Sequence, residues 1–311
     1  MRQGARVRAL VFYNSFNSCG WLDDAAPDVR GEFEALAGDV RDAHFVREAV
    51  RGCETVLHLA ALISIPFSYR SPAAFVETNV MGTLNVLQAA REAGAARVVC
   101  TSTSEVYGSA RYVPIDEAHP LQAQSPYAAS KIAADQLALS FERSFGLPVM
   151  LLRPFNTFGP RQSARAIIPT IISQIADGRR ELHLGSLHPT RDFSFVADTV
   201  SAFLRAAVAH GMAGKVINTG AGFEVSIGEL AALIARIMRV EVEIAHDAER
   251  VRPATSEIDR LCAGVERART ELGWTPAYAG REGLGRGLEE TVAWFREPSN
   301  LRRYKPGQYN V

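Results

Sequence analysis

ARVVCTST at residues 96–103, SPYAASKIAADQLALSFERSFG at 125–146 and PVMLLRPF at 148–155 have the patterns of a strand, a helix and a strand. The first and last are short apolar runs rich in β-branched residues, which are typical of buried strands. The middle stretch has helical length, and Ser125, Pro126 and Gly146 supply an N-cap, a first helical residue and a C-cap. This order predicts two parallel neighbours in a sheet with helices on its faces.

The same alternation extends toward the amino terminus, where we expect strands at 5–12, 33–40 and 55–60 and helices at 42–52 and 72–94. Beyond residue 156 the pattern loosens, and helices are expected at 165–178, 226–239 and 287–297. The sequence therefore predicts an α/β fold. It consists of a doubly wound parallel sheet and a smaller C-terminal part on the carboxyl edge of that sheet, where open α/β folds bind ligands.

Composition excludes several classes of protein. Of the 311 residues 47% are hydrophobic, and Lys plus Arg equal Asp plus Glu at 34 each, so neither disorder, nor nucleic acid nor an anionic membrane is indicated. No apolar stretch approaches the roughly 20 residues that cross a bilayer, and MRQGARVRAL lacks the apolar core of a signal peptide. The four scattered cysteines are typical of reduced thiols in a cytoplasmic protein, and no Cys or His spacing predicts a metal site.

Two motifs carry the chemistry: TSTSEVYG at 101–108 ends a predicted strand, and YAASK at 127–131 opens a predicted helix. Tyr127 and Lys131 are four residues apart and share a helical face. The Lys131 ammonium would then lower the pKa of the Tyr127 phenol, making it a general base for a substrate hydroxyl that Thr103 also contacts. YxxxK alone is common by chance, and an ordinary surface Tyr and Lys is the alternative.

The context of these motifs is more specific. With LRPFNTFGPR (152–161), HLAA (58–61), RDFSFVAD (191–198) and LGWTP (272–276), the chain resembles the extended short-chain dehydrogenase/reductase superfamily of nucleotide-sugar epimerases and dehydratases. The resemblance implies a Rossmann-like, NAD-binding domain over 1–155, to which 191–220 contribute. It also implies a sugar-nucleotide domain over 156–190 and 221–311, and a homodimer formed through the helices at 72–94 and 125–146.

Glu105 discriminates within that superfamily. The 4-epimerases resemble SSAAVYG here, whereas sugar 4,6-dehydratases use an acid at this position to take the proton from C5 after C4 is oxidised. Thr103-Ser104-Glu105 resembles the GDP-mannose dehydratases; the dTDP-glucose dehydratases have Thr-Asp-Glu. Ser104 is no strong acid, so Glu105 or a water must protonate the departing C6 hydroxyl. The alternative for Glu105 is a solvated or salt-bridged acid at a strand end.

Finer features point to one clade. VFYNSFNSCGWLDD (11–24), GPRQSARAIIPTII (159–172) and YKPGQYNV (304–311) are similar to UDP-N-acetylglucosamine 4,6-dehydratases of legionaminic-type pathways, although Cys19 stands where a Trp is expected. The strings TSEVYG (103–108) and NTFGPR (156–161) also resemble UDP-glucuronate decarboxylases, which are the first alternative, followed by NDP-sugar 4-epimerases. A UDP-sugar is therefore the expected substrate.

The resemblance also assigns binding residues. For NAD it implies Asp39 and Val40 beside the adenine, the turn Leu59, Ala60 and Ala61 beside the ribose and diphosphate, and Tyr127 and Lys131 at the nicotinamide ribose. For the sugar nucleotide it implies Asn156, Arg161, Arg191 and Arg252, since an Arg fork suits a phosphate. A helix N-cap is the alternative for Asp39, and surface salt bridges are the alternative for Arg191 and Arg252.

One expected element is missing from the sequence. The superfamily begins with a strand, a TGxxGxxG loop and a helix that hold the dinucleotide pyrophosphate, and no such loop occurs here. We expect roughly 20 to 25 residues, one βα unit, to be absent, leaving two strand edges unpaired. The second strand ends in Phe12-Tyr13-Asn14 without an acid, so NAD over NADP rests on the resemblance. A catalytically inactive scaffold is the alternative from another class.

Overall fold

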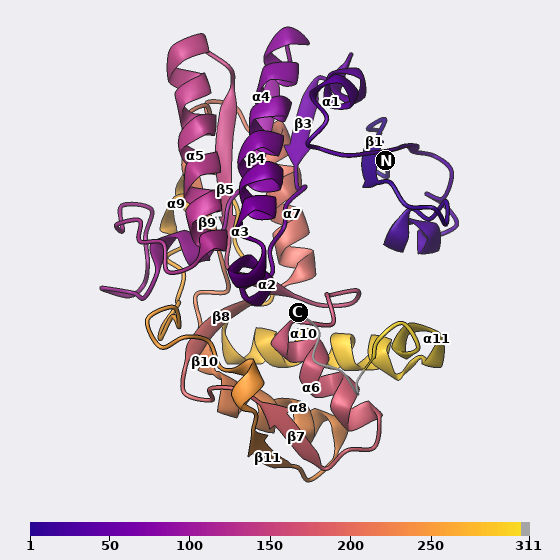
Figure 1. The fold of residues 1–311 in the computed structure, drawn as a ribbon, viewed down its shortest axis with the longest axis vertical. Coiled ribbons are helices and arrows are strands. Elements are labelled where there is room, and N and C mark those ends of the chain that lie inside the picture. Colours follow the sequence, from indigo (N-terminus) through magenta and orange to yellow (C-terminus); the bar gives the residue numbers. More distant parts are fainter. Residues whose placement is uncertain (306–311) are drawn as a thin grey trace.

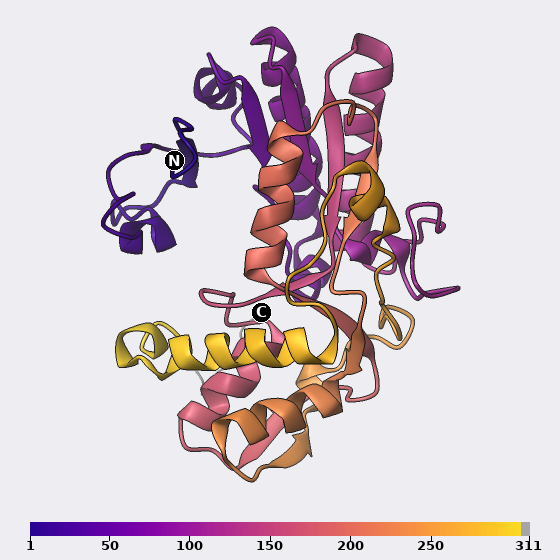
Figure 2. The same ribbon diagram turned by 180° about the vertical axis from the view of Figure 1, so that it is seen from behind.

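The computed structural model describes residues 1–305. Its main sheet has four parallel strands in the order β3 (Thr55–His58), β4 (Arg97–Thr101), β5 (Val149–Pro154) and β9 (Val216–Thr219). One face is covered by α1 (Ala43–Val50), α4 (Gly82–Glu92) and α5 (Pro126–Phe145), and the other by α7 (Val196–Val208) and α9 (Glu266–Glu271) (Figures 1 and 2). Helices on both faces of a parallel sheet confirm the doubly wound prediction.

The two N-terminal strands form a separate parallel pair, β1 (Arg8–Phe12) with β2 (Glu34–Gly38). Within residues 1–305, β1 pairs only with β2 and β3 only with β4, so the sheet is interrupted between β1 and β3, as the sequence led us to expect. Figure 1 shows the pair beside the β3 edge. It is attached through Arg8, whose Nη1 donates to the carbonyls of Ala49 and Arg51 at the end of α1.

The second lobe packs around its own apolar core. A mixed sheet has the order β10 (Glu224–Ser226), β8 (Thr190–Phe195), β6 (Asn156–Phe158), and a parallel pair joins β7 (Glu181–Leu184) to β11 (Glu243–His246). The helices are α6 (Ile167–Ala176), α8 (Ile227–Met238), α10 (Gly280–Arg296) and α11 (Pro298–Leu301). Their apolar faces meet in one cluster of buried side chains, so this lobe is stabilised largely by its own burial.

The helix expected at 287–297 begins earlier, at Gly280. The glycine-rich run GLGRG (283–287) therefore lies within the first turns of α10. Gly283 is required there, because a Cβ at this position would lie 2.1 Å from the Tyr278 carbonyl carbon.

The long helix expected at 72–94 is a chain of three segments. α3 (Pro72–Phe75) runs into a π-helical segment, η2 (Val76–Met81), which continues into α4. The wider turn places Asn79 inward, where its Nδ2 donates to the Leu62 carbonyl and to Ser130 Oγ of α5. This segment thus ties the loop after β3 to the helix that carries the YAASK motif.

Short elements complete the chain: the 3₁₀ helices η1 (Gly20–Asp24), η3 (Ser104–Tyr107) and η4 (Ala248–Arg250), and the helix α2 (Ile65–Arg70). Among residues 1–305 no helix has both the length and the apolar character needed to cross a membrane. Of the three strings that resemble the UDP-N-acetylglucosamine dehydratases, YKPGQYNV (304–311) lies mostly outside the described residues.

Candidate active site

The TSTSEVYG motif forms the end of β4 and the turn that follows it. β4 ends at Thr101, and Thr103, in extended conformation, caps η3 by accepting a hydrogen bond from the Glu105 backbone N–H at 3.2 Å. Thr103, Ser104 and Glu105 are all buried. Gly108 ends the turn with φ +66°, and a Cβ there would lie 2.6 Å from the Gln122 carbonyl oxygen. The motif therefore holds a carboxylate and a hydroxyl inside the protein at the carboxyl edge of the sheet.

The YAASK motif opens α5 beside this turn. Ser125 caps the helix by accepting from the Ala128 N–H at 3.1 Å, and Pro126 follows it, as the sequence predicts. Tyr127 and Lys131 are both buried. The Lys131 Nζ donates to the Thr101 carbonyl at 2.6 Å, and the Tyr127 ring packs edge-on against Phe75. Helix α5 and strand β4 thus bring the five predicted catalytic residues together.

The pKa of the Tyr127 hydroxyl differs from the sequence-based expectation. Burial raises the pKa of Tyr127, and the charges of Glu105 and Asp135 add to the rise, whereas a hydrogen bond with Thr103 and the charge of Arg165 oppose it. The spacing of Tyr127 and Lys131 predicts that Lys131 lowers this pKa, but desolvation of the phenolate is the larger effect here. Burial also lowers the pKa of Lys131, against the charges of Asp135 and Cys100.

The residues expected around the cofactor follow the ends of β2 and β3. Leu59 is 59% exposed just beyond β3, and Ala60 and Ala61 continue this turn half-buried. The Asp39 carboxylate accepts from both Nε and Nη2 of Arg41, and this hydrogen bonding holds its pKa below the ordinary range.

Two further observations bear on the adenine-side residues. Asp39 is not the N-cap of α1: that position is Asp42, which accepts from the N–H groups of His44 and Phe45. The Val40 side chain is buried in the core cluster on the α4 side of the sheet, so it does not face solvent.

The substrate candidates separate into two groups. Arg191 and Arg252 converge on Glu257: Arg191 Nη2 lies 3.0 Å and Arg252 Nη1 lies 3.6 Å from its Oε1. Only 6% of Arg191 is exposed, so the alternative of a surface salt bridge is wrong for it. Burial lowers the pKa of Arg191 and the negative charge of Glu105 opposes this, so the arginine pair lies within electrostatic reach of the catalytic carboxylate.

Among the described residues, the other two candidates form no hydrogen bond or ion pair with that cluster. Asn156 begins β6 and is half-buried, whereas Arg161 is exposed with φ +70° and makes no ion pair among residues 1–305.

A hollow beside Arg252 is lined by residues of α2 and by 249–253. Tyr69 of α2 closes it with a hydrogen bond of 2.6 Å to Ser256, which joins the two lobes at this point.

Three charged residues near the centre were not singled out from the sequence. Glu257 ends the string RPATSE (252–257), Arg165 lies in GPRQSARAIIPTII (159–172), and Asp135 lies one turn beyond Lys131 on α5. The i, i+4 spacing from Lys131 is a signal that could have found Asp135. Glu257 and Arg165 reach the site through tertiary packing, which no local pattern predicts.

Comparison with known proteins decides the family. Residues 1–286 match the GDP-mannose 4,6 dehydratase family. The chain belongs to this family. It is thereby a member of the extended short-chain dehydrogenase/reductase superfamily, whose NAD-dependent epimerases and dehydratases act on sugar nucleotides.

Two similar proteins are dTDP-glucose 4,6-dehydratases. A dTDP-glucose 4,6-dehydratase of Streptomyces niveus is 35% identical over 266 residues, 85% of this chain and 76% of the relative. The structure of DesIV, a dTDP-glucose 4,6-dehydratase from Streptomyces venezuelae with NAD and TYD bound, has a TM-score of 0.84 at 29% identity, covering 98% of this chain and 92% of DesIV.

A 4-epimerase is also similar in structure. The UDP-N-acetylglucosamine 4-epimerase from Methanobrevibacter ruminantium M1, in complex with UDP-N-acetylmuramic acid, has a TM-score of 0.80 at 26% identity over 92% of this chain and 90% of the epimerase. The fold therefore accommodates both reactions, and the residues of the site must distinguish them.

Proposed function

We propose that this chain is an NAD-dependent sugar-nucleotide 4,6-dehydratase that acts on UDP-N-acetylglucosamine. The observation that carries the proposal is Glu105, a buried carboxylate two residues after Thr103 whose charge acts on both Tyr127 and Arg191. An epimerase, which only oxidises and reduces C4, has no use for a base at this point. A dehydratase needs one for the C5 proton.

The residues at the carboxyl ends of β3 and β4 fit the nicotinamide half of NAD. The Thr101 hydroxyl is buried without a hydrogen-bond partner among the described residues, beside the buried Lys131, and the exposed Leu59 lies at the neighbouring strand end. Tyr127 and Lys131 would hold the nicotinamide ribose, Leu59, Ala60 and Ala61 the diphosphate side, and Asp39 the adenine. When bound, NAD⁺ takes up a hydride from C4 of the sugar and gives it back at C6.

Tyr127, Thr103 and Lys131 serve the C4 hydroxyl. Tyr127 accepts the hydroxyl proton, and Thr103 hydrogen-bonds the same oxygen. A buried phenol with a raised pKa is a poor base by itself, so the Lys131 ammonium must stabilise the phenolate during the reaction.

Glu105 serves C5 and C6. A ketone at C4 acidifies the C5 proton, which Glu105 removes as the C6 hydroxyl leaves as water. Ser104 is no acid, so the proton that the departing hydroxyl needs comes from Glu105 itself or from a water. A solvent-derived proton finally returns to C5, and the net change is the loss of one water.

For the nucleotide we propose Arg191 and Arg252 as diphosphate ligands, with Asn156 and Arg161 nearby. Glu257 holds the two guanidinium groups in one place, and Arg252 Nη1 is buried without a hydrogen bond in the described part of the chain, so it has capacity for an anion. We propose that residues 1–155 with 191–220 bind the cofactor, and that 156–190 and 221–311 bind the sugar nucleotide. Four unpaired cysteines fit a cytoplasmic enzyme.

The proposal is tested with Glu105→Gln. The amide is nearly isosteric and cannot take a proton, so dehydration of UDP-N-acetylglucosamine should fall by about 10²- to 10⁴-fold, the usual contribution of a general base. Glu229→Gln is the matched control, because Glu229 caps helix α8 in the second lobe and its amide oxygen can still accept the Ser226 N–H. Full turnover by Glu105→Gln would show that the carboxylate is not the base.

A further inference from the structure

Helix α5 contacts the catalytic strand end twice, through residues one turn apart. Lys131 donates to the carbonyl of Thr101, and Asp135 accepts from the Ser102 Oγ at 2.6 Å. Residues four apart lie on one helical face, so the two hydrogen bonds fall on successive residues directly before Thr103. Both helix residues are almost fully buried, Lys131 at 4% and Asp135 at 2% exposure. The helix thus fixes the strand end where the catalytic turn begins.

Arg153 of β5 holds the same turn from the other side. Its Nη2 donates to Asp135 Oδ2 at 2.9 Å, its Nε lies 3.4 Å from Ser102 Oγ, and its Nη1 donates to the Tyr107 hydroxyl at 2.9 Å. Ser102 precedes Thr103, and Tyr107 is the last residue of η3. One buried ion pair therefore brackets the segment that carries Thr103 and Glu105.

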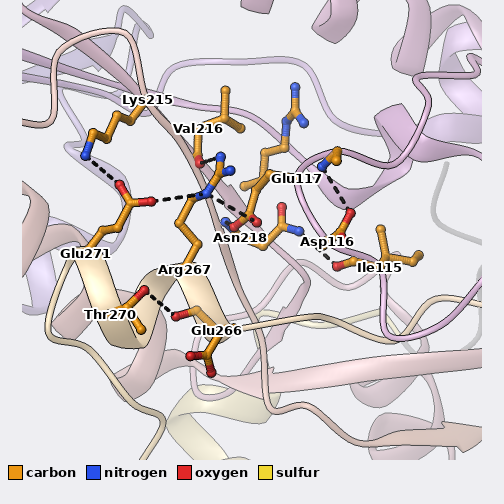
Figure 3. A network of polar contacts seen from close by, with 12 residues as sticks. Ile115, Asp116, Glu117, Lys215, Val216, Asn218, Glu266, Arg267, Thr270 and Glu271 are labelled. Atoms are coloured by element: carbon orange, nitrogen blue, oxygen red, sulfur yellow. Dashed lines mark hydrogen bonds and ion pairs between the residues drawn. The ribbon is translucent and has the colours of Figure 1, made fainter.

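The network continues from Tyr107 to the surface. The Tyr107 hydroxyl donates to Asn218 Oδ1 at 2.7 Å, and the Asn218 N–H donates to Glu117 Oε1 at 2.8 Å. Figure 3 shows the outer end, where Arg267 lies between Glu117 and Glu271. This end is anchored on β9 and α9, so the inner pair is held by several elements rather than by one helix.

We propose that Asp135 is a positioning residue of the reaction, an inference that rests on the proposed function. Its carboxylate fixes the strand end carrying Thr103 and Glu105 against the helix carrying Tyr127 and Lys131, and it supplies the buried negative charge that pairs with Arg153. Breaking the buried Asp135–Arg153 ion pair would leave an uncompensated charge. The two side chains therefore strongly favour the arrangement in which they are paired.

Charged and titratable groups from several elements interact with Tyr127, Lys131, Asp135 or Arg153. They are His58 of β3, Cys100 of β4, Glu105 and Tyr107 of η3, Arg153 of β5, and Arg165 before α6. The charge of Asp135 raises the pKa of both Tyr127 and Lys131. Its removal should therefore lower the pKa of each.

The first test uses Asp135→Asn and the pH dependence of kcat/KM for dehydration. Both the acidic and the basic limb of the pH profile should move to lower pH. The value of kcat should fall by about tenfold to a hundredfold. KM should change little, because Asp135 contacts no substrate. Asp135→Glu keeps the charge and should leave the limbs in place. Limbs that stay unmoved in Asp135→Asn would overturn the proposal.

The matched control is Asp198→Asn. Asp198 is another buried aspartate, which accepts the backbone N–H groups of Ala277 and Tyr278 away from the site. This variant should lose thermal stability without any shift of the pH limbs. If Asp198→Asn shifted the pH limbs as far as Asp135→Asn does, the shift would be a general result of removing a buried aspartate and would contradict a specific role of Asp135.

The second test needs no activity and separates this inference from the proposed function. Asp135→Asn should lower the melting temperature, and adding Arg153→Met should recover part of that loss because an unbalanced buried guanidinium is removed. Simple addition of the two losses would refute the role of Asp135 as counter-charge. An inactive wild-type chain that still shows the recovery would refute the proposed function alone.

Discussion

Glu105 and Tyr127 share one buried strand end but have opposite requirements. Glu105 must be charged to accept a proton, and Tyr127 must lose one that its environment retains, because burial disfavours the phenolate. The negative charge of Glu105 itself raises the pKa of Tyr127. In the proposed reaction the tyrosine acts first, at C4, because the C4 ketone is what acidifies the C5 proton that the glutamate then removes.

His58 gives a pH-dependent prediction that is independent of catalysis. Its ring is buried at the end of β3, 2.9 Å from the Thr83 hydroxyl, and burial lowers its pKa to about 3 from 6.5. Below pH 6.5 the imidazole binds a proton in the unfolded chain but not in the folded one. The free energy of unfolding therefore decreases as the pH is lowered from about 7.5 to about 5.5. Between about pH 7.5 and about pH 5.5 His58 should cost about 1.4 kcal/mol.

The measurement is denaturant unfolding of wild type and His58→Gln at both pH values. The glutamine retains a hydrogen bond to Thr83 and does not titrate, so it should remove that part of the pH dependence. His210→Gln serves as the control, because His210 is exposed. Equal pH dependence in wild type and His58→Gln would show that the ring is not kept neutral by burial.

At the level of single residues, the sequence predicted the members of the site better than their contacts. Thr103, Glu105, Tyr127 and Lys131 meet as expected, since a strand end and a helix start dictate their positions. The partner of Lys131 could not be foreseen, because the Thr101 carbonyl is a backbone group present in any sequence. Arg165 and Glu257 arrive from remote segments, and only the packed fold reveals them.

In helix α10 the packing of the chain requires one glycine of the GLGRG run but not its neighbour. Gly283→Ala should destabilise the protein by about 1–3 kcal/mol, because its Cβ would meet the Tyr278 backbone at 2.1 Å, which neither side can relieve. Gly285→Ala, two residues on, meets nothing within 4 Å and should be neutral or stabilising by up to about 1 kcal/mol through helix propensity. Denaturant midpoints measure both, and equal effects would contradict the steric account.

Among the larger elements, the first five strands were predicted closely, whereas β6 to β11, including β9 of the main sheet, were not. The five strands from β1 to β5 lie within their expected ranges, because short apolar runs between turns leave little freedom. The π-helical segment at Val76–Met81 could not be predicted, since a π turn has the same apolar periodicity as the α-helix around it. The start of α10 was misjudged because its first turns are rich in glycine, a poor helix former.

At the scale of the whole molecule we propose a homodimer formed through α4, α5 and the segment before them. Val76 and Met81 are 51% and 46% exposed there. Exposed apolar side chains that cluster on one face mark an interaction surface. Wild type should sediment as a dimer at micromolar concentration, and Met81→Glu should shift it toward monomer.

Val208→Glu is the control for this surface. Val208 is 66% exposed on α7, across the sheet, so its substitution should leave the dimer intact. Sedimentation of the wild type as a monomer, or equal disruption by both variants, would show that α4 and α5 are not the interface.

The most direct test of the proposed reaction is the mass of the product formed from UDP-N-acetylglucosamine and NAD⁺ in D₂O. The account predicts a sugar nucleotide that has lost one water and carries one solvent deuterium at C5, because the carbon that gives its proton to Glu105 must recover one from solvent. A product with the formula of the substrate would instead identify a 4-epimerase. Loss of carbon dioxide from UDP-glucuronate in the parallel reaction would identify a decarboxylase, and unchanged sugar nucleotides throughout would contradict an enzymatic role.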